Sequence, residues 1–429
     1  MPRRTIPTNG SGEKERAILV GLEVGRKDGF PVEDSLQELS LLSETAGAVV
    51  KAQVIQRRDK IDSAYYIGRG KLEEIHSLQL KTNANLIIFN GDLTPSQQLK
   101  LEEAIGVKVI DRTQLILDIF AQRAQTKEGK LQVELAQLNY LLPRLKGKGV
   151  LLSRLGGGIG TRGPGETKLE VDRRRTRARI FSLKRGIKGL WTHRRIQREG
   201  RKRSALSIAS LVGYTNSGKS TLLNTLCKAC VPTEDKLFAT LDPTTRKVVF
   251  PNKQELLLTD TVGFIKKLPH HLVAAFQATL EEVREADLLL NVLDASSPQA
   301  EEQCRITHKV LEELQANDKP QITVLNKIDK LKNKGMVEYL KREMPPAVAI
   351  SALKGWGLEE LLIKIQDVLF DQSILVKLAI PYQDSFFLAW LKRRGKVLSS
   401  CYEEDKVLVE VRVGKRWEEK IKPFLLPEK

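Results

Sequence analysis

One short motif constrains the fold of this chain more than any other feature. Residues 205–212 are a largely apolar run of strand length that leads directly into Gly213-Tyr-Thr-Asn-Ser-Gly-Lys-Ser220. The pattern G-x-x-x-x-G-K-S between a strand and a helix predicts a phosphate-binding loop, in which backbone N–H groups surround phosphate oxygens. In such a loop Lys219 contacts the β- and γ-phosphates, and the Ser220 hydroxyl binds Mg²⁺. We therefore expect a nucleotide-binding α/β domain.

Three later motifs extend this prediction. Asp260-Thr-Val-Gly263 follows a strand-like segment, so Asp260 is expected to hold Mg²⁺ through water and the Gly263 N–H to contact the γ-phosphate. In Asn326-Lys-Ile-Asp329, the Asp329 carboxylate can accept hydrogen bonds from guanine N1–H and the 2-amino group, which adenine lacks. Ser351-Ala-Leu353 suits backbone recognition of guanine O6. Together these motifs predict a hydrolase that converts GTP and water to GDP and phosphate.

A threonine that closes over Mg²⁺ and the γ-phosphate is expected between the phosphate loop and Asp260. Residues 238–246 supply Thr240, Thr244 and Thr245, and spacing alone does not choose among them. The full set of residues expected to contact the nucleotide is Gly213, Tyr214, Thr215, Asn216, Ser217, Gly218, Lys219, Ser220, Phe238, Ala239, Thr240, Leu241, Asp242, Asp260, Thr261, Val262, Gly263, Asn326, Lys327, Ile328, Asp329, Ser351, Ala352 and Leu353.

The segments on either side of the nucleotide-binding region alternate strand-like and helix-like patterns. In the N-terminal part we expect strands at 17–24, 49–56, 86–90 and 107–111, and helices at 34–46, 71–81 and 96–104. In the C-terminal part we expect strands at 374–380 and 406–413, and helices at 385–397 and 417–421. Both parts therefore read as small α/β domains.

Residues 112–203 have a different character. Apolar residues recur at helical spacing over 114–142, and Pro143 is expected to end that helix. Eight glycines then occur within 147–165, together with several lysines and arginines, which predicts a basic loop. A second helix at about 166–184 would run back along the first, giving a helical hairpin with a glycine-rich tip.

The charge of the chain is concentrated after this loop. Residues 173–203 contain fourteen Lys or Arg and a single acid, Glu199, within a chain of net charge +18. A solvated helix face usually mixes both signs of charge, so this segment favours a polyanionic partner such as RNA. An acidic protein surface would also fit.

These observations predict a multidomain α/β chain in five parts. We expect a flexible tail at 1–15, an N-terminal α/β domain at 16–111, the hairpin with its basic loop and linker at 112–203, a GTPase domain with a mostly parallel sheet at 204–372, and a small C-terminal domain at 373–429. No apolar run is long enough to span a membrane, and the first residues lack an apolar signal core. We expect a cytoplasmic monomer.

The chain resembles the HflX family of ribosome-associated GTPases. The resemblance is carried by the loop Gly156-Gly-Gly-Ile-Gly-Thr-Arg-Gly-Pro-Gly-Glu-Thr-Lys-Leu-Glu170, by the phosphate loop, by Phe238-Ala-Thr-Leu-Asp242 and by Asp260-Thr-Val-Gly-Phe264. It implies binding to the large (50S) ribosomal subunit and its rRNA, and splitting of stalled or idle 70S ribosomes under stress by the GTP-bound protein. It also selects Thr240 as the second Mg²⁺ ligand beside Ser220. The alternative is an RNA-binding assembly or remodelling factor whose affinity the nucleotide regulates.

The position after Gly263 is Phe264, where many related GTPases have a glutamine that orients the attacking water. Intrinsic hydrolysis is therefore expected to be slow. The residues expected to carry it are Lys219, Thr240, Gly263 and Asn216. Some GTPases without the glutamine use an asparagine at the position of Asn216 to bind K⁺ beside the phosphates, and the resemblance implies the same here. The alternative is that Asn216 only braces the loop.

Overall fold

The structure is a computed structural model that describes residues 14–25, 31–154, 168–203, 207–227, 237–238, 240–250, 254–266, 277–331, 334–370, 373–414 and 418–426. The contacts within it divide the chain into two compact units. The first runs to Leu190 and also includes Leu237 and Phe238, and the second begins at Trp191 and contains the rest of the described residues. Within the described residues, no helix has the length and apolar character needed to cross a bilayer.

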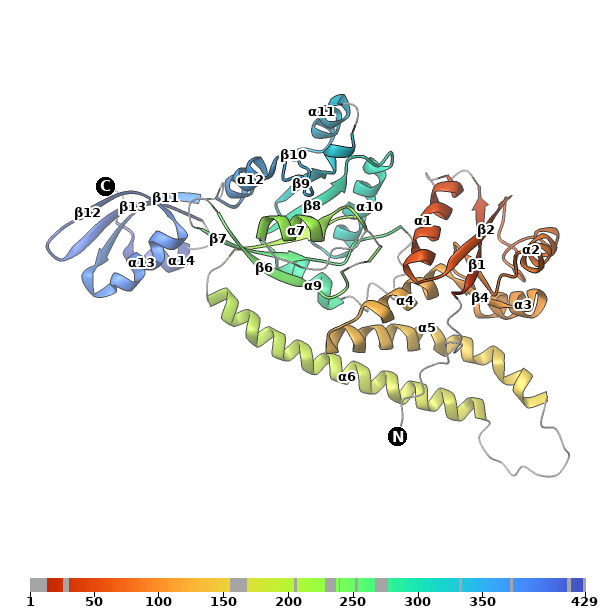
Figure 1. Ribbon diagram of the computed structural model, residues 1–429. Coiled ribbons are helices and arrows are strands. Elements are labelled where there is room, and N and C mark those ends of the chain that lie inside the picture. The colour runs from red at the N-terminus through yellow and green to blue at the C-terminus, as the bar shows by residue number, and fades with distance from the viewer. Residues whose placement is uncertain are drawn as a thin grey trace. The chain divides into compact units, whose positions relative to one another are not determined.

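The first unit is built on a four-stranded parallel sheet with the strand order β2-β1-β3-β4 (Figure 1). Its strands and helices alternate along the chain: β1 (Arg16–Val24), α1 (Val32–Thr45), β2 (Val49–Arg58), α2 (Arg69–Thr82), β3 (Leu86–Phe89), α3 (Pro95–Ile105) and β4 (Lys108–Asp111). Every residue of β3 is buried, because helices cover both faces of the sheet. The alternation predicted from the sequence corresponds to these seven elements.

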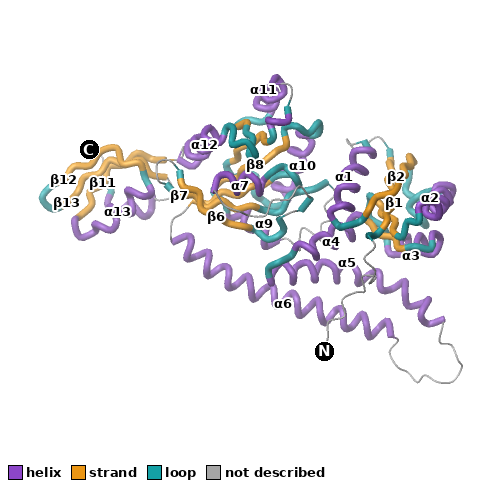
Figure 2. Tube along the Cα trace, viewed as in Figure 1, coloured by secondary structure: helices purple, strands orange, loops and turns teal. Residues whose placement is uncertain are grey.

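Three helices follow the sheet of the first unit: α4 (Arg112–Arg123), α5 (Lys127–Arg154) and α6 (Lys168–Arg203). Figure 2 shows α5 and α6 running side by side, and Arg179 of α6 forms two hydrogen bonds with Glu134 of α5. The prediction of a single helix over 114–142 was wrong, because the chain is extended at Ala124 and a new helix starts after Thr126, whose hydroxyl accepts from Gly129 N–H.

The prediction that Pro143 ends a helix was also wrong, since Pro143 lies inside α5. Proline removes one helical hydrogen bond, and tertiary contacts next to it offset that loss. Tyr140 is buried one turn before the proline, and Arg144 directly after it is anchored to the sheet. The predicted glycine-rich loop accordingly starts later than expected, and its residues 155–165 lie outside the described residues.

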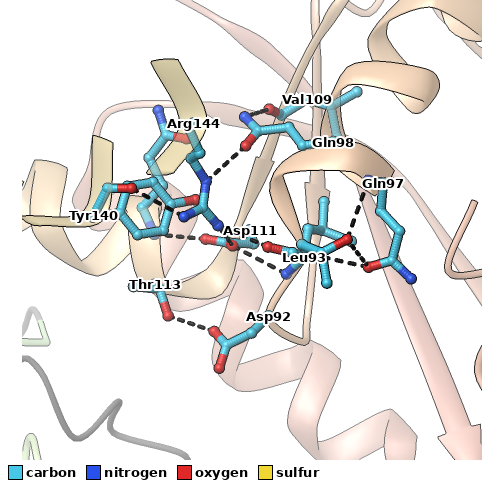
Figure 3. A network of polar contacts seen from close by, with 11 residues as sticks. Asp92, Leu93, Gln97, Gln98, Val109, Asp111, Thr113, Tyr140 and Arg144 are labelled. Atoms are coloured by element: carbon cyan, nitrogen blue, oxygen red, sulfur yellow. Dashed lines mark hydrogen bonds and ion pairs between the residues drawn. The ribbon is translucent and has the colours of Figure 1, made fainter. Parts of the chain in front are cut away.

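Arg144 is the centre of a polar network in the first unit (Figure 3). Its guanidinium donates to the buried carboxylate of Asp111 at 3.1 Å, to the carbonyl of Leu93 at 2.7 Å and to the side chain of Gln98 at 3.0 Å. Burial raises the pKa of Asp111, and the positive charge of Arg144 opposes that rise. One arginine thus joins α5 to the ends of β3 and β4.

We expect Arg144→Met to weaken the first unit, because the mutation leaves the Asp111 carboxylate buried without its cationic partner. The expected loss is about 3 kcal/mol, the usual cost of breaking a buried ion pair by removing one member. Native-state hydrogen exchange of the β3 and β4 amides measures this loss for the first unit separately. Arg177→Met on the exposed face of α6 is the control, and equal protection in the two variants would contradict the role of Arg144.

The second unit contains a six-stranded sheet with the order β10-β9-β8-β5-β7-β6, parallel except for β6 (Figure 1). Its strands are β5 (Ser207–Val212), β6 (Thr244–Val249), β7 (Glu255–Asp260), β8 (Leu288–Asp294), β9 (Gln321–Asn326) and β10 (Ala347–Ala349). The described helices packed around it are α7 (Lys219–Cys227), α9 (Gln277–Glu285), α10 (Ala300–Glu313), α11 (Lys334–Glu343) and α12 (Leu358–Phe370). This confirms the predicted α/β class and the mostly parallel sheet.

The end of the chain forms a three-stranded antiparallel sheet with the order β11-β13-β12. Its elements are β11 (Ser373–Pro381), α13 (Ser385–Arg394), β12 (Lys396–Tyr402), β13 (Lys406–Gly414) and α14 (Glu418–Ile421). The predicted helix at 385–397 is shorter than expected, and β12 was not predicted. At Gly395, between α13 and β12, an added Cβ would lie 2.7 Å from the side chain of Val411, so a glycine is favoured there.

Candidate nucleotide-binding site

The predicted motif residues meet at one edge of the six-stranded sheet. Gly213 follows β5, Asp260 ends β7, Asn326 ends β9, and Ser351 follows β10 directly after Ile350. These four strands are parallel, so their carboxyl ends lie at the same edge, which is where open α/β sheets bind ligands.

The phosphate loop is a tight turn between β5 and α7. Gly213 has a φ of 137°, and an added Cβ there would lie 2.2 Å from the carbonyl oxygen of Val292. Lys219 is buried, and its ammonium donates to the carbonyls of Gly213 at 3.2 Å and Tyr214 at 2.7 Å. Burial lowers the pKa of Lys219 to about 8, although the charge of Asp260 opposes this change. The loop therefore holds a cation that has lost much of its hydration.

Three side-chain oxygens converge beside the loop. The hydroxyls of Ser220 and Thr240 lie 2.6 Å and 3.0 Å from Oδ2 of Asp260, and 2.8 Å from each other. Asp260 is fully buried, which raises the pKa of its carboxyl group, and its Oδ1 has no hydrogen-bond partner among the described residues. Two hydroxyls and a carboxylate are oxygen donors of the kind that Mg²⁺ prefers, so the cluster fits that ion.

The structure also separates the three candidate threonines. Thr240 reaches the oxygen cluster, whereas Thr244 and Thr245 are part of β6, and the hydroxyl of Thr245 is paired with that of Thr259 at 3.0 Å. Strand β6 was not predicted, and for that reason spacing could not choose among the three.

The base-recognition motifs are joined to the phosphate loop by Asn326. Its amide donates to the carbonyl of Ser217 at 2.9 Å, and its oxygen accepts from the N–H of Ala352 at 2.9 Å. The hydroxyl of Ser351 donates to the carboxylate of Asp329 at 2.5 Å and thereby orients it. One amide side chain thus fixes the loop and the two base-side motifs relative to one another.

The other predicted residues pack against the loop, are buried elsewhere or are exposed. Gly263 lies so close to the loop that an added Cβ would be 2.8 Å from Thr215 Cα and 2.9 Å from Lys219 Nζ. Leu353 is 73% exposed, and the ring of Phe238 packs edge-on against Phe120 at 4.8 Å within the first unit. Leu241, Val262 and Thr261 are buried, and the Thr261 hydroxyl donates to the carbonyl of Leu211 at 2.6 Å. Ala239 lies outside the described residues.

Two features of the site were missed in the sequence. Asp294, at the end of β8, forms an ion pair with Lys327 at 2.7 Å, and the same ammonium donates to the carbonyl of Asn216 at 2.7 Å. An acid directly after a buried strand of a parallel sheet was the available signal for Asp294. The side chain of Tyr214 accepts from Lys266 N–H at 3.0 Å, and no sequence pattern pointed to that contact.

A phosphate loop, an oxygen cluster and paired base-side motifs at the carboxyl edge of a mostly parallel sheet define the class of P-loop GTPases. Comparison with known families agrees with this class. Residues 33–121 match the family described as GTP-binding GTPase N-terminal, 123–201 match GTP-binding GTPase Middle Region, and 208–327 match 50S ribosome-binding GTPase.

Two similar proteins define the family more closely. GTPase HflX of Caldanaerobacter subterraneus subsp. tengcongensis is 49% identical over 414 residues, which cover 96% of this chain and 94% of that protein. GTPase HflX of Escherichia coli K12 is 41% identical over 401 residues, which cover 93% of both. The chain belongs to the HflX family of GTPases and is a GTP hydrolase. A crystal structure of a GTP-binding protein from Sulfolobus solfataricus with GDP is 27% identical and covers 82% of this chain and 98% of its own, with a TM-score of 0.43.

Proposed function

We propose that the chain binds GTP and Mg²⁺ at the carboxyl edge of the six-stranded sheet. P-loop GTPases use Mg²⁺ with their nucleotide. Ser220 and Thr240 would hold the ion directly and Asp260 through water, and the convergence of their three oxygens carries this assignment. When bound, the ion neutralises charge on the β- and γ-phosphates.

Other residues of the site would bind the phosphates of GTP. Lys219 would place its ammonium on the β- and γ-phosphates, and the Gly263 N–H would bind a γ-phosphate oxygen. Phe264 is 2% exposed and has no group that could orient water, so help for the attacking water must come from a partner or a cation. This supports a slow intrinsic rate.

Guanine selection would depend on Asp329, which Ser351 orients. We expect Asp329→Asn to lower GTP affinity at least about 100-fold and to favour xanthosine triphosphate, whose 2-oxo group accepts a hydrogen bond where guanine donates one. Competition between the two nucleotides measures the preference. Asp318→Asn, on the loop before β9, is the matched control. Equal affinity of the unmutated protein for both nucleotides contradicts the assignment.

We also propose that Asn216 binds K⁺ during hydrolysis. The residue is exposed at the phosphate loop, has a φ of 59°, and carries an amide oxygen, which is a suitable ligand for that ion. A cation at this position would offset the charge that develops between the β- and γ-phosphates.

Replacing Na⁺ by K⁺ at constant ionic strength should therefore raise the hydrolysis rate by about tenfold, the size of a modest electrostatic contribution. Asn216→Ala should remove this difference and leave GDP affinity nearly unchanged. Equal rates in the two salts, with and without ribosomes, would mean that Asn216 only braces the loop.

We propose that the GTP-bound protein binds the 50S subunit and splits 70S ribosomes, acting in the cytoplasm as a monomer. The observation that carries ribosome binding is the α5–α6 hairpin. Ile180, Leu183 and Ile187 of α6 are buried, whereas basic residues around them are exposed: Arg174, Arg175, Arg177, Lys184, Arg185 and Lys188. An exposed row of one charge sign suits an RNA backbone. The family description of residues 208–327 as a 50S ribosome-binding GTPase supports the same partner.

The test is to add the protein and GTP to purified 70S particles and to follow their dissociation by light scattering. Splitting is expected with GTP and not with GDP, and deletion of residues 147–165 should abolish it while GTP binding is kept. Binding should also weaken steeply with salt, since each neutralised phosphate releases counterions. Binding to 50S without splitting would favour the alternative, an RNA-binding assembly or remodelling factor regulated by nucleotide.

A further inference from the structure

The segment that follows Asp260 is fastened to the phosphate loop by three hydrogen bonds. Two join backbone groups: Phe264 N–H donates to the carbonyl of Gly213 at 3.0 Å, and Thr215 N–H donates to the carbonyl of Phe264 at 2.8 Å. The third comes from a side chain, since the phenol oxygen of Tyr214 accepts from Lys266 N–H at 3.0 Å. Tyr214 and Phe264 therefore pair as a short parallel bridge, extended by the tyrosine to Lys266.

These three hydrogen bonds fix the position of Gly263 next to the loop. The glycine is packed between Thr215 and Lys219, with less than 3 Å available for any added Cβ on either side. A small shift of residues 263–266 would therefore move the Gly263 N–H relative to the loop. Tyr214 is 6% exposed, so its hydrogen bond is shielded from water and is correspondingly stronger than a surface one.

The phosphate-loop pattern specifies no side chain at position 214, because that residue contributes its backbone to the turn. Tyr214 nevertheless uses its side chain, whose hydroxyl oxygen accepts a hydrogen bond from the backbone N–H of Lys266.

We propose that Tyr214 is a positioning residue for GTP hydrolysis: its hydroxyl holds residues 263–266 so that the Gly263 N–H meets the γ-phosphate. The proposal rests on the role assigned above to Gly263. The phosphate loop would then have two separate functions, one for its backbone and one for the Tyr214 side chain. The backbone of the loop binds the α- and β-phosphates of GDP and GTP alike, and the Tyr214 hydroxyl matters only when a γ-phosphate is present.

The test is Tyr214→Phe, which keeps the buried ring and removes one hydroxyl. We expect kcat to fall about tenfold and the affinity for a non-hydrolysable GTP analogue to fall about fivefold, as for the loss of one buried hydrogen bond. GDP affinity should change less than about twofold, because GDP lacks the γ-phosphate. Hydrogen exchange at the Lys266 amide should become faster. Tyr339→Phe removes a hydroxyl that donates to Glu301 away from the site and is the matched control.

An unchanged ratio of GTP-analogue affinity to GDP affinity in Tyr214→Phe would overturn the proposal. If both affinities fall by the same factor, the mutation has damaged the loop in general. Gly263→Ala separates this failure from failure of the assigned site. If Gly263→Ala loses hydrolysis while Tyr214→Phe does not, only the role of Tyr214 is wrong. If both variants hydrolyse GTP normally, the role assigned to Gly263 is wrong as well.

Discussion

The burial of a charged lysine inside the phosphate loop is the constraint on which the rest of the second unit depends. Lys219 has exchanged water for two loop carbonyls, and its countercharge is the buried carboxylate of Asp260 on the neighbouring strand. A buried ammonium is tolerated only where fixed dipoles and an opposite charge surround it. The tight turn at Gly213, the end of β7 and the hydroxyls of Ser220 and Thr240 all supply that environment. The same environment is complementary to a polyphosphate with its divalent cation.

Order in the rest of the site follows from hydrogen bonds that start at the loop. The side chain of Asn326 links the loop to the base-side motifs. The bridge between Tyr214 and Phe264 links the loop to the segment after Asp260. These bonds join residues 264 and 266 directly to the phosphate loop, without a long chain of side chains. In the first unit Arg144 has a comparable structural role, since it fixes the hairpin helix α5 to the sheet.

Much of this architecture could be predicted from the sequence, because motifs such as Gly213–Ser220 follow apolar strands at regular spacing. The α/β class and the alternation in the first unit were visible for the same reason. What could not be predicted depends on tertiary contacts. Pro143 stays inside a helix because Arg144 anchors it, and β12 is held by its pairing with β13. The choice of Thr240 and the contact of Tyr214 likewise required the positions of β6 and Lys266.

The most direct test of this account is the proton balance of GDP binding. Burial lowers the pKa of Lys219 to about 8 in the free protein, and phosphate binding should favour its charged form. Calorimetry in buffers of different ionisation enthalpy should then show net proton uptake on GDP binding that is larger at pH 8 than at pH 7. The affinity for GDP should fall as the pH rises through 8, because the charged form of Lys219 binds the phosphates. Lys219→Arg, which stays charged, should show no such uptake. Binding of GDP to the unmutated protein at pH 8 without proton uptake would contradict the account.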